Sequence, residues 1–138
     1  MEIKKVDDPY EVAKLIKFKD NAEECFPCER GEWIQWLVDA VKSPKLCLYI
    51  QYKEGFRIAG YAVAMDAVFP PLSDSVDLIY ITGGDETVKS LLRHLARWAK
   101  SCRAAKIMCR TPVDAGFSEL LRRSDFCKTG ELWEHRIG

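Results

Sequence analysis

The pattern of apolar residues changes from strand-like to helical after Gly84, and this change most constrains the fold. Apolar side chains then recur on one face of a 3.6-residue helix, at Val88, Leu91, Leu92, Leu95, Ala99 and Cys102. A short apolar run, 76–82, precedes this helix, and another, 106–109, follows it. Such a strand–helix–strand unit predicts two parallel strands joined by a right-handed connection.

The first 41 residues predict one strand and two helices. Residues 2–6 alternate polar and apolar side chains, as a short strand does. Helical spacing follows over about 9–19, with Asp8 as the candidate N-cap, and returns over 33–41. The residues between these helices, 21–28, read as a loop.

The runs 46–52 and 57–65 are rich in β-branched, aromatic and aliphatic residues and are separated by a turn, so they predict a β-hairpin. Asp114 is the candidate cap of a last helix, and 126–137 predicts a final extended segment. The expected fold class is therefore α/β (α+β): a mixed sheet flanked by helices in the order β-α-α-β-β-β-α-β-α-β.

Length and composition point to one domain over residues 1–138. The chain has 138 residues and 48% hydrophobic residues, enough for a continuous core. Its apolar runs are far shorter than the roughly 20 residues of a membrane helix. The first residues have no apolar core like that of a secretory signal, so we expect a cytoplasmic protein.

The charges are balanced overall but segregated along the chain. The formal net charge is zero, which gives no general reason to expect nucleic acid as a partner. Residues 1–86 hold 10 Lys and Arg against 16 Asp and Glu, whereas residues 87–138 hold 11 against 5. Seven basic residues and no acidic one lie from Lys89 to Arg110. This segment either attracts anions or forms a solvated helix face.

Six cysteines are too few for a disulfide scaffold, and in a reducing cytoplasm we expect free thiols. Cys25-Phe26-Pro27-Cys28 has the C-x-P-C form of thiol–disulfide enzymes. However, it follows an acidic stretch instead of a buried strand, which favours small buried side chains over a redox function. No second pair at zinc-ligand spacing accompanies it, so no metal is expected.

Several phrases, in this order, resemble the GNAT superfamily of acyl-CoA-dependent N-acyltransferases. The sequence at 57–61, Arg-Ile-Ala-Gly-Tyr, resembles that family's third strand, commonly K-I-V-G-F. Residues 91–100 are similar to its long helix, and 117–126 to its closing helix and the "Y-E-K-L-G-F" phrase. The resemblance covers nearly the whole chain and implies a mostly antiparallel central sheet.

The resemblance also implies acetyl-CoA or another acyl-CoA as co-substrate. In the family, backbone N–H groups of a Q/R-x-x-G-x-G/A loop before the long helix hold the pyrophosphate. An alignment without gaps matches only Gly84 to this motif, and a shortened loop fits equally well. The cofactor-binding candidates are Ile81, Thr82, Gly83, Gly84, Thr87, Lys89 and Arg93.

Two carboxylates, Asp85 and Glu86, stand in the first turn of this helix. They stabilise the helix start but compete with a pyrophosphate for the same N–H donors. The chain therefore either fills its own anion site, or uses the basic residues from Lys89 onward to hold CoA phosphates from the side.

For the chemical step, the resemblance implies a base for the amine proton and an acid for the thiolate. Asp77 is the carboxylate in a strand position like that of family bases, although an exposed strand residue is the simpler interpretation. Leu121 stands where the family often has a catalytic Tyr, so Tyr80 is the substitute candidate, with core packing as its alternative.

Two functions remain open from the sequence. The first is a GNAT-like N-acyltransferase that moves an acyl group, acetyl in the first instance, to an amine held by the acidic first 86 residues. The second is a catalytically inactive GNAT-fold module that binds a partner through the basic segment or an exposed Trp. Dimers are frequent in the family, which makes a homodimer one candidate assembly.

Overall fold

A mixed sheet forms the centre of the molecule. The computed structural model describes residues 2–66, 75–109, 115–124 and 126. The described strands form a five-stranded sheet in which spatial order follows chain order, with four antiparallel strands and a fifth parallel to the fourth. The strands are β1 (Glu2–Lys5), β2 (Leu46–Tyr52), β3 (Ile58–Met65), β4 (Ser75–Thr82) and β5 (Lys106–Cys109).

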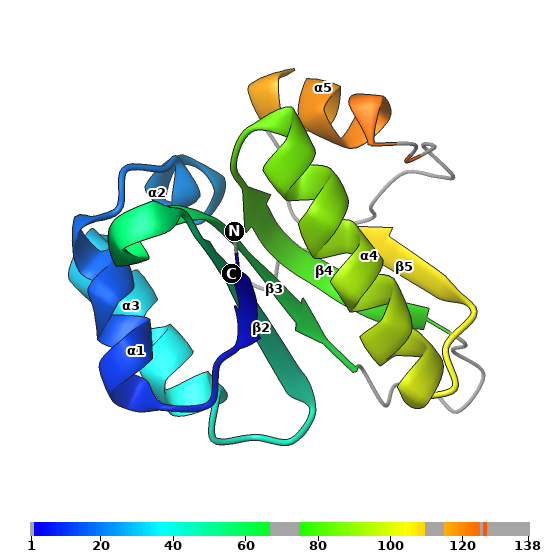
Figure 1. Ribbon diagram of the computed structural model, residues 1–138, viewed down its shortest axis with the longest axis horizontal. Coiled ribbons are helices and arrows are strands. Elements are labelled where there is room, and N and C mark those ends of the chain that lie inside the picture. Colours follow the sequence, from blue (N-terminus) through cyan, green and yellow to red (C-terminus); the bar gives the residue numbers. More distant parts are fainter. Residues whose placement is uncertain (1, 67–74, 110–114, 125, 127–138) are drawn as a thin grey trace, which may run out of the picture.

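Helices cover both faces of this sheet (Figure 1). Two of the N-terminal helices, α1 and α3, lie on one side, and the long helix α4 crosses the other. The α-helices are α1 (Pro9–Ala13), α2 (Ala22–Cys25), α3 (Arg30–Ala40), α4 (Asp85–Ser101) and α5 (Ala115–Arg123). Two 3-10 turns, η1 (Lys14–Lys17) and η2 (Glu54–Phe56), complete the described elements.

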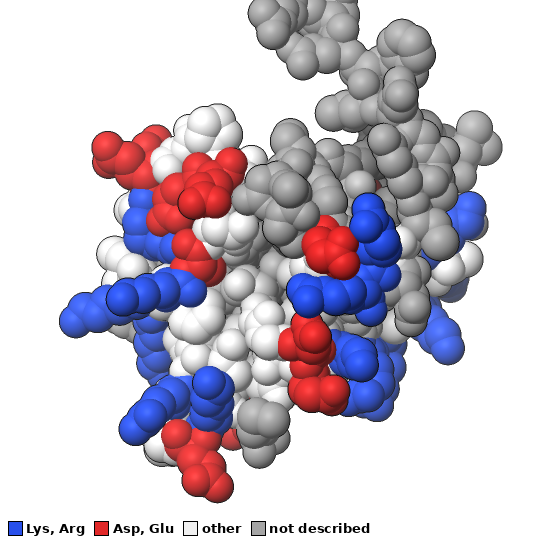
Figure 2. Space-filling view, turned by 90° about the horizontal axis from the view of Figure 1, so that it is seen from above, with Lys and Arg blue, Asp and Glu red and all other residues white. Residues whose placement is uncertain are grey.

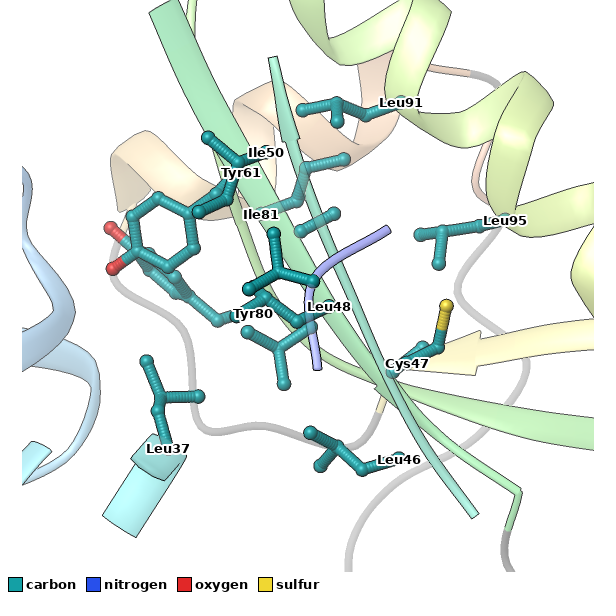
Figure 3. Close-up of a cluster of buried hydrophobic side chains, with 14 of the residues drawn as sticks. Leu37, Leu46, Cys47, Leu48, Ile50, Tyr61, Tyr80, Ile81, Leu91 and Leu95 are labelled. Carbon is teal, nitrogen blue, oxygen red and sulfur yellow. The ribbon is translucent and has the colours of Figure 1, made fainter. Parts of the chain in front are cut away.

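The core has a layer on each face of the sheet, because successive strand side chains point in opposite directions. On one face, Tyr61 and Tyr80 extend toward the side of Leu37 from α3 (Figure 3). On the other, Cys47 points toward Leu95 of α4 (Figure 3). All five of these side chains are buried.

The structure confirms the main elements expected from the sequence. β2 and β3 form the hairpin, and β4, α4 and β5 form the strand–helix–strand unit with parallel strands. The sheet is mixed and mostly antiparallel, as the resemblance implied. Asp114 and, apart from Phe126, the expected final strand 126–137 lie outside the described residues.

Two N-terminal expectations were wrong in detail. The helix expected over 9–19 is α-helical only to Ala13 and then tightens into η1, which ends at Lys17. The segment 21–28 is not wholly a loop, because it contains the single turn α2. A side-chain contact starts this turn: Oδ1 of Asp20 accepts a 2.9 Å hydrogen bond from the Ala22 N–H.

Candidate functional site

β4 pairs with β5 only along its first half. The parallel register runs from Ser75 opposite Lys106 to Leu78 opposite Cys109. Beyond it, residues 80–82 of β4 are in register with β3 but with no described residue of β5. A β-bulge lies at this point, because Val63 faces Tyr80 whereas Ala64 faces Leu78. Bulges bend a strand and increase its twist, so we expect β4 to bend at this point, next to its last described pair with β5, Leu78 opposite Cys109.

The connection from β4 to α4 consists of Gly83 and Gly84 alone. Gly83 has φ +142°, which favours glycine, whereas Gly84 is the N-cap with φ −68° and ψ 168°. A Cβ atom added to Gly84 would meet nothing within 4 Å. The structure thus has the shortened loop, and the backbone at the start of α4 is accessible on the side of Gly84.

The two carboxylates at the start of α4 lie near basic side chains. Oδ1 of Asp85 lies 3.8 Å from Nη2 of Arg123 in α5, and Oε1 of Glu86 lies 3.9 Å from Nζ of Lys89. The N-cap glycine has no side chain that could accept a hydrogen bond from the helix. Among the described residues, therefore, no side chain fills the anion site that the first-turn N–H groups form.

Thr87 fixes the first turn of α4 against the sheet. The Cγ2 atom of the buried Thr87 lies 2.8 Å from where a Cβ of Gly60 would stand and 2.7 Å from that of Gly83. Ile81 is also buried, among the side chains of the core (Figure 3). These two cofactor candidates can therefore offer a ligand their backbone atoms, but not their side chains.

Lys89 and Arg93 lie on the exposed side of α4, about one and two turns after Gly84. The Nη2 atom of Arg93 donates a 3.0 Å hydrogen bond to the Ser90 hydroxyl. Among the described residues, the ion pair of Lys89 is the long contact to Glu86, 3.9 Å from Nζ to Oε1. Both side chains are exposed on the side of the helix near its start.

The two catalytic candidates occupy different settings on β4. Asp77 is half-buried in the half that pairs with β5, about 20 Å along the strand from Gly83. Tyr80 is fully buried, and its hydroxyl donates a 2.5 Å hydrogen bond to Oδ1 of Asn21 and accepts one of 3.2 Å from the Asn21 N–H. Burial raises the pKa of Tyr80 far above its ordinary value.

A buried polar network beside Tyr80 was not found from the sequence. The carboxylate of Asp20 has no exposed surface and accepts hydrogen bonds from both Nη atoms of Arg30, at 2.7 and 3.1 Å. The Tyr61 hydroxyl donates a further bond of 2.8 Å to it. Trp33 then donates through Nε1 to the Tyr61 oxygen at 3.0 Å. These residues are 10 to 41 positions apart, so no local pattern indicates the network.

Aromatic rings connect this network to the surface. Phe26 and Trp33 stack at 5.0 Å between ring centroids, and Trp33 and Trp36 stack at 5.5 Å. Trp33 also contacts Tyr80 edge-to-face at 5.8 Å. Trp36, 40% exposed, is the outer ring of this stack. The sequence indicated Trp36 only as an aromatic at the edge of an apolar helix face.

Charged side chains surround an uncharged centre at this end of the molecule. Figure 2 looks onto the end where α2 and the start of α4 lie, and charged groups stand on both sides of a central area without charge. In the part of the chain that is described, no cluster of three or more His, Cys, Asp or Glu residues could hold a metal ion. None of the described helices has the length and hydropathy of a membrane-spanning segment.

No protein-family model and no curated protein sequence matches the chain. Solved structures do. Aminoglycoside 6'-N-acetyltransferase AAC(6')-IG from Acinetobacter haemolyticus has a TM-score of 0.80 at 13% identity, covering 100% of this chain and 99% of that one. AAC(6')-Iy, in complex with the bisubstrate analogue CoA-S-monomethyl-acetylneamine, has a TM-score of 0.74 at 16% identity. The match covers 99% of this chain and 97% of that one. Ribosomal-protein-alanine N-acetyltransferase from Brucella melitensis biovar Abortus 2308 has a TM-score of 0.74 at 12% identity. The match covers 99% of this chain and 100% of that one.

These likenesses define the class of fold. The chain has the fold of the GNAT acetyltransferases over essentially its full length, as the resemblance in the sequence implied. At identities of 12 to 16% they show the fold alone. What the chain does has to be argued from its own residues.

Proposed function

We propose that this protein is an N-acyltransferase that moves an acetyl group from acetyl-CoA to an amine. The observation that carries the proposal is the start of α4, a 17-residue helix with a glycine N-cap and first-turn carboxylates directed to Arg123 and Lys89. Its unpaired N–H groups and positive dipole end suit a pyrophosphate. The neighbour solved with a CoA bisubstrate analogue supports this co-substrate.

The backbone of 81–84 and the N–H of Thr87 would line the pyrophosphate, with Lys89 and Arg93 reaching its oxygens from the side. From Gly84 back to the bulge at Ile79 is about 16 Å of strand. The acyl end of an extended co-substrate that follows β4 would then lie beyond the last described pair of β4 with β5, Leu78 opposite Cys109. Among the described residues, no strand pairs with β4 on the β5 side past that point.

In the proposed reaction, the amine nitrogen attacks the thioester carbonyl, the C–N bond forms, and the C–S bond breaks to release CoA as the thiolate. The amine loses one proton and the thiolate gains one. Asp77 is the β4 carboxylate that we propose takes the amine proton, directly or through water. The Tyr80 hydroxyl donates its hydrogen bond to Asn21 in this structure, so we propose that it orients the 20–22 segment and that solvent protonates the thiolate.

The acceptor is proposed to be a cationic amine, because the acidic excess of the chain lies in residues 1–86, which include the helices α1 and α3 on the side of the sheet opposite α4. The neighbours named above are, by name, an aminoglycoside N-acetyltransferase and a ribosomal-protein-alanine N-acetyltransferase, whose acceptors differ widely in size. A reaction that uses acetyl-CoA also fits the cytoplasmic location expected from the sequence.

Binding of the co-substrate is the direct test. We expect 1 mM acetyl-CoA to raise the melting temperature of the purified protein, because a ligand that binds only the native state stabilises it. At a ligand concentration of 100 times Kd, the gain is about 2.7 kcal/mol. Release of CoA thiol in the presence of a panel of amines then tests transfer. The absence of any shift at 5 mM acetyl-CoA would contradict the proposal.

The same absence would favour the second candidate function, a GNAT-fold module that does not bind CoA. Two observations support that candidate: the connection before α4 has only two residues, and Leu121 in α5 stands where the family often has a proton-donating Tyr.

A further inference from the structure

We propose that the outward side of α4 binds the phosphate backbone of a duplex nucleic acid without reading its sequence. Five exposed cations form this surface, which we call the α4 basic face: Lys89, Arg93, Arg97, Lys100 and Arg103. In Figure 2 several basic side chains lie on the right, the side of α4 and α5.

Within the described residues, the α4 basic face has a single ion pair, between Lys89 and Glu86. Residues 87–109 contain no acidic residue. Lys89 lies 3.9 Å from Glu86, whereas Arg97, Lys100 and Arg103 form no ion pair with any described residue. Like charges four positions apart on a helix repel each other and destabilise it. The stability of α4 therefore does not explain this row of cations.

Arg103 provides a second, independent observation. It follows the end of α4 with φ +64°, in the left-handed conformation that strongly favours glycine at this position. The Ala104 N–H donates to the Ala99 carbonyl at 2.9 Å, which closes the helix end in the usual way. The favourable interaction of its charge with the helix dipole offsets only part of the cost of this backbone conformation. An arginine at a glycine position extends the row of cations past the helix.

The geometry favours a duplex over other anionic partners. From Lys89 to Lys100 the row is about 17 Å long, and a duplex carries one charge per about 1.7 Å of axis. Arginine forks also fit phosphate oxygens. The exposed large hydrophobic side chains among the described residues are Tyr10, Ile16, Trp36 and Phe56, all outside α4. The face thus lacks the apolar side chains that a membrane helix inserts and the rings on which single-stranded bases stack.

This surface can be tested separately from the proposed co-substrate site. Lys89 and Arg93 belong to both. Arg97, however, lies 13 residues beyond Gly84, about 20 Å along the helix, and Lys100 and Arg103 lie further still. These three cations are therefore the ones to reverse.

The experiment measures fluorescence anisotropy of labelled 20-bp RNA and DNA duplexes from 50 to 200 mM KCl. We expect Kd values of about 1 to 100 μM at 50 mM salt, with log K falling against log salt at a slope of about −4. The triple variant R97E/K100E/R103E should bind at least tenfold more weakly, and its slope should be shallower by about 3. The RNA and DNA arms show which backbone is preferred.

A matched variant, K42E/K45E/K53E, makes the same change in net charge at three exposed lysines elsewhere and should bind like the wild type. If circular dichroism shows that R97E/K100E/R103E does not fold, R97Q/K100Q/R103Q replaces it. This variant should also bind the duplexes more weakly than the wild type and the matched variant do. The proposal is wrong if neither duplex binds at 100 μM protein, or if the matched triple loses as much affinity. It is equally wrong if a single strand, polyglutamate or phosphatidylserine vesicles bind as tightly as the duplexes.

Discussion

The Tyr61 hydroxyl donates a 2.8 Å hydrogen bond to Oδ2 of Asp20, and this bond connects a central strand to a carboxylate with no exposed surface. Arg30 binds both oxygens of the same carboxylate, and Trp33 donates to the Tyr61 oxygen. The segment before α2 is thereby fixed to the sheet next to Tyr80, on the side where we propose that the acceptor binds.

Removing one donor from this carboxylate should lower stability. We expect Tyr61→Phe to reduce the free energy of unfolding by about 1.5 to 3 kcal/mol, because a buried charge loses a hydrogen bond. Arg30→Ala should cost more, about 3 to 5 kcal/mol, because the charge loses its counter-ion. Urea denaturation measures both. A Tyr61→Phe variant as stable as the wild type would show that the carboxylate does not depend on this bond.

Gly84→Asp should separate stability from co-substrate binding. An aspartate at the N-cap accepts hydrogen bonds from the first-turn N–H groups, and the open space at Gly84 accommodates it. We expect stability to stay equal or rise by a few tenths of a kcal/mol, while the acetyl-CoA-dependent rise in melting temperature disappears. Gly84→Ala is the control for size without charge. Retained acetyl-CoA binding in Gly84→Asp would place the pyrophosphate elsewhere.

Gly60→Ala should destabilise the protein strongly. Its Cβ would lie directly against the Thr82 carbonyl oxygen and 2.8 Å from Cγ2 of Thr87, so the start of α4 would have to move. We expect a loss of about 2 kcal/mol or more in thermal or urea unfolding. Gly31→Ala is the matched control, because its Cβ meets nothing within 4 Å and alanine favours the helix. The hypothesis of close packing fails if both variants behave alike.

The thiols of the C-x-P-C segment should be unreactive near neutral pH. Burial, followed by the charges of Glu32 and Glu23, raises the pKa of Cys28, and Cys25 is buried. Burial also raises the pKa of Cys47 to about 12. With a chromogenic disulfide reagent at pH 7.5, we expect these three to react far more slowly in the native protein than in guanidinium. Rapid labelling that Cys28→Ser abolishes would revive a redox function.

The ionised carboxylate of Glu11 should stabilise the protein at pH values above its pKa. Nζ of Lys4 and the Tyr52 hydroxyl both donate to this carboxylate. The hydrogen bond from Lys4 is the main cause that lowers the pKa of Glu11 below its ordinary value of 4.5. A lowered folded-state pKa contributes stability that is present above 4.5 and lost as the pH falls through the folded value. The melting temperature of Glu11→Gln should therefore lie below that of the wild type at pH 7, and the difference should vanish in acid.

Local patterns predicted most of the fold, because they depend on neighbours in sequence. Asp8 was identified as an N-cap, and its Oδ1 accepts a 2.9 Å hydrogen bond from the Tyr10 N–H. The parallel pairing of β4 and β5 followed from the length of the helix between them. Local patterns could not distinguish a two-residue loop before α4 from a loop of the family's length that has lost most of its motif, since Gly83 and Gly84 are compatible with both.

The candidate site depended much more on tertiary contacts. Tyr80 looked available as an acid because its sequence neighbours say nothing of Asn21, which is 59 residues away and accepts a hydrogen bond from its hydroxyl. Asp85 and Glu86 looked able to close the anion site, but in the structure their carboxylates lie 3.8 and 3.9 Å from the cationic groups of Arg123 and Lys89. Spatial neighbours contributed by distant segments decide such questions.

The sequence by itself determined which segments are strands and helices and where the charges gather, because periodicity and composition are local properties of the chain. Only the tertiary structure decided which polar groups remain open to a ligand. That depends on contacts such as the Asp20–Tyr61 hydrogen bond and the close packing of Thr87 on Gly60, which form only when the helices pack on the assembled sheet.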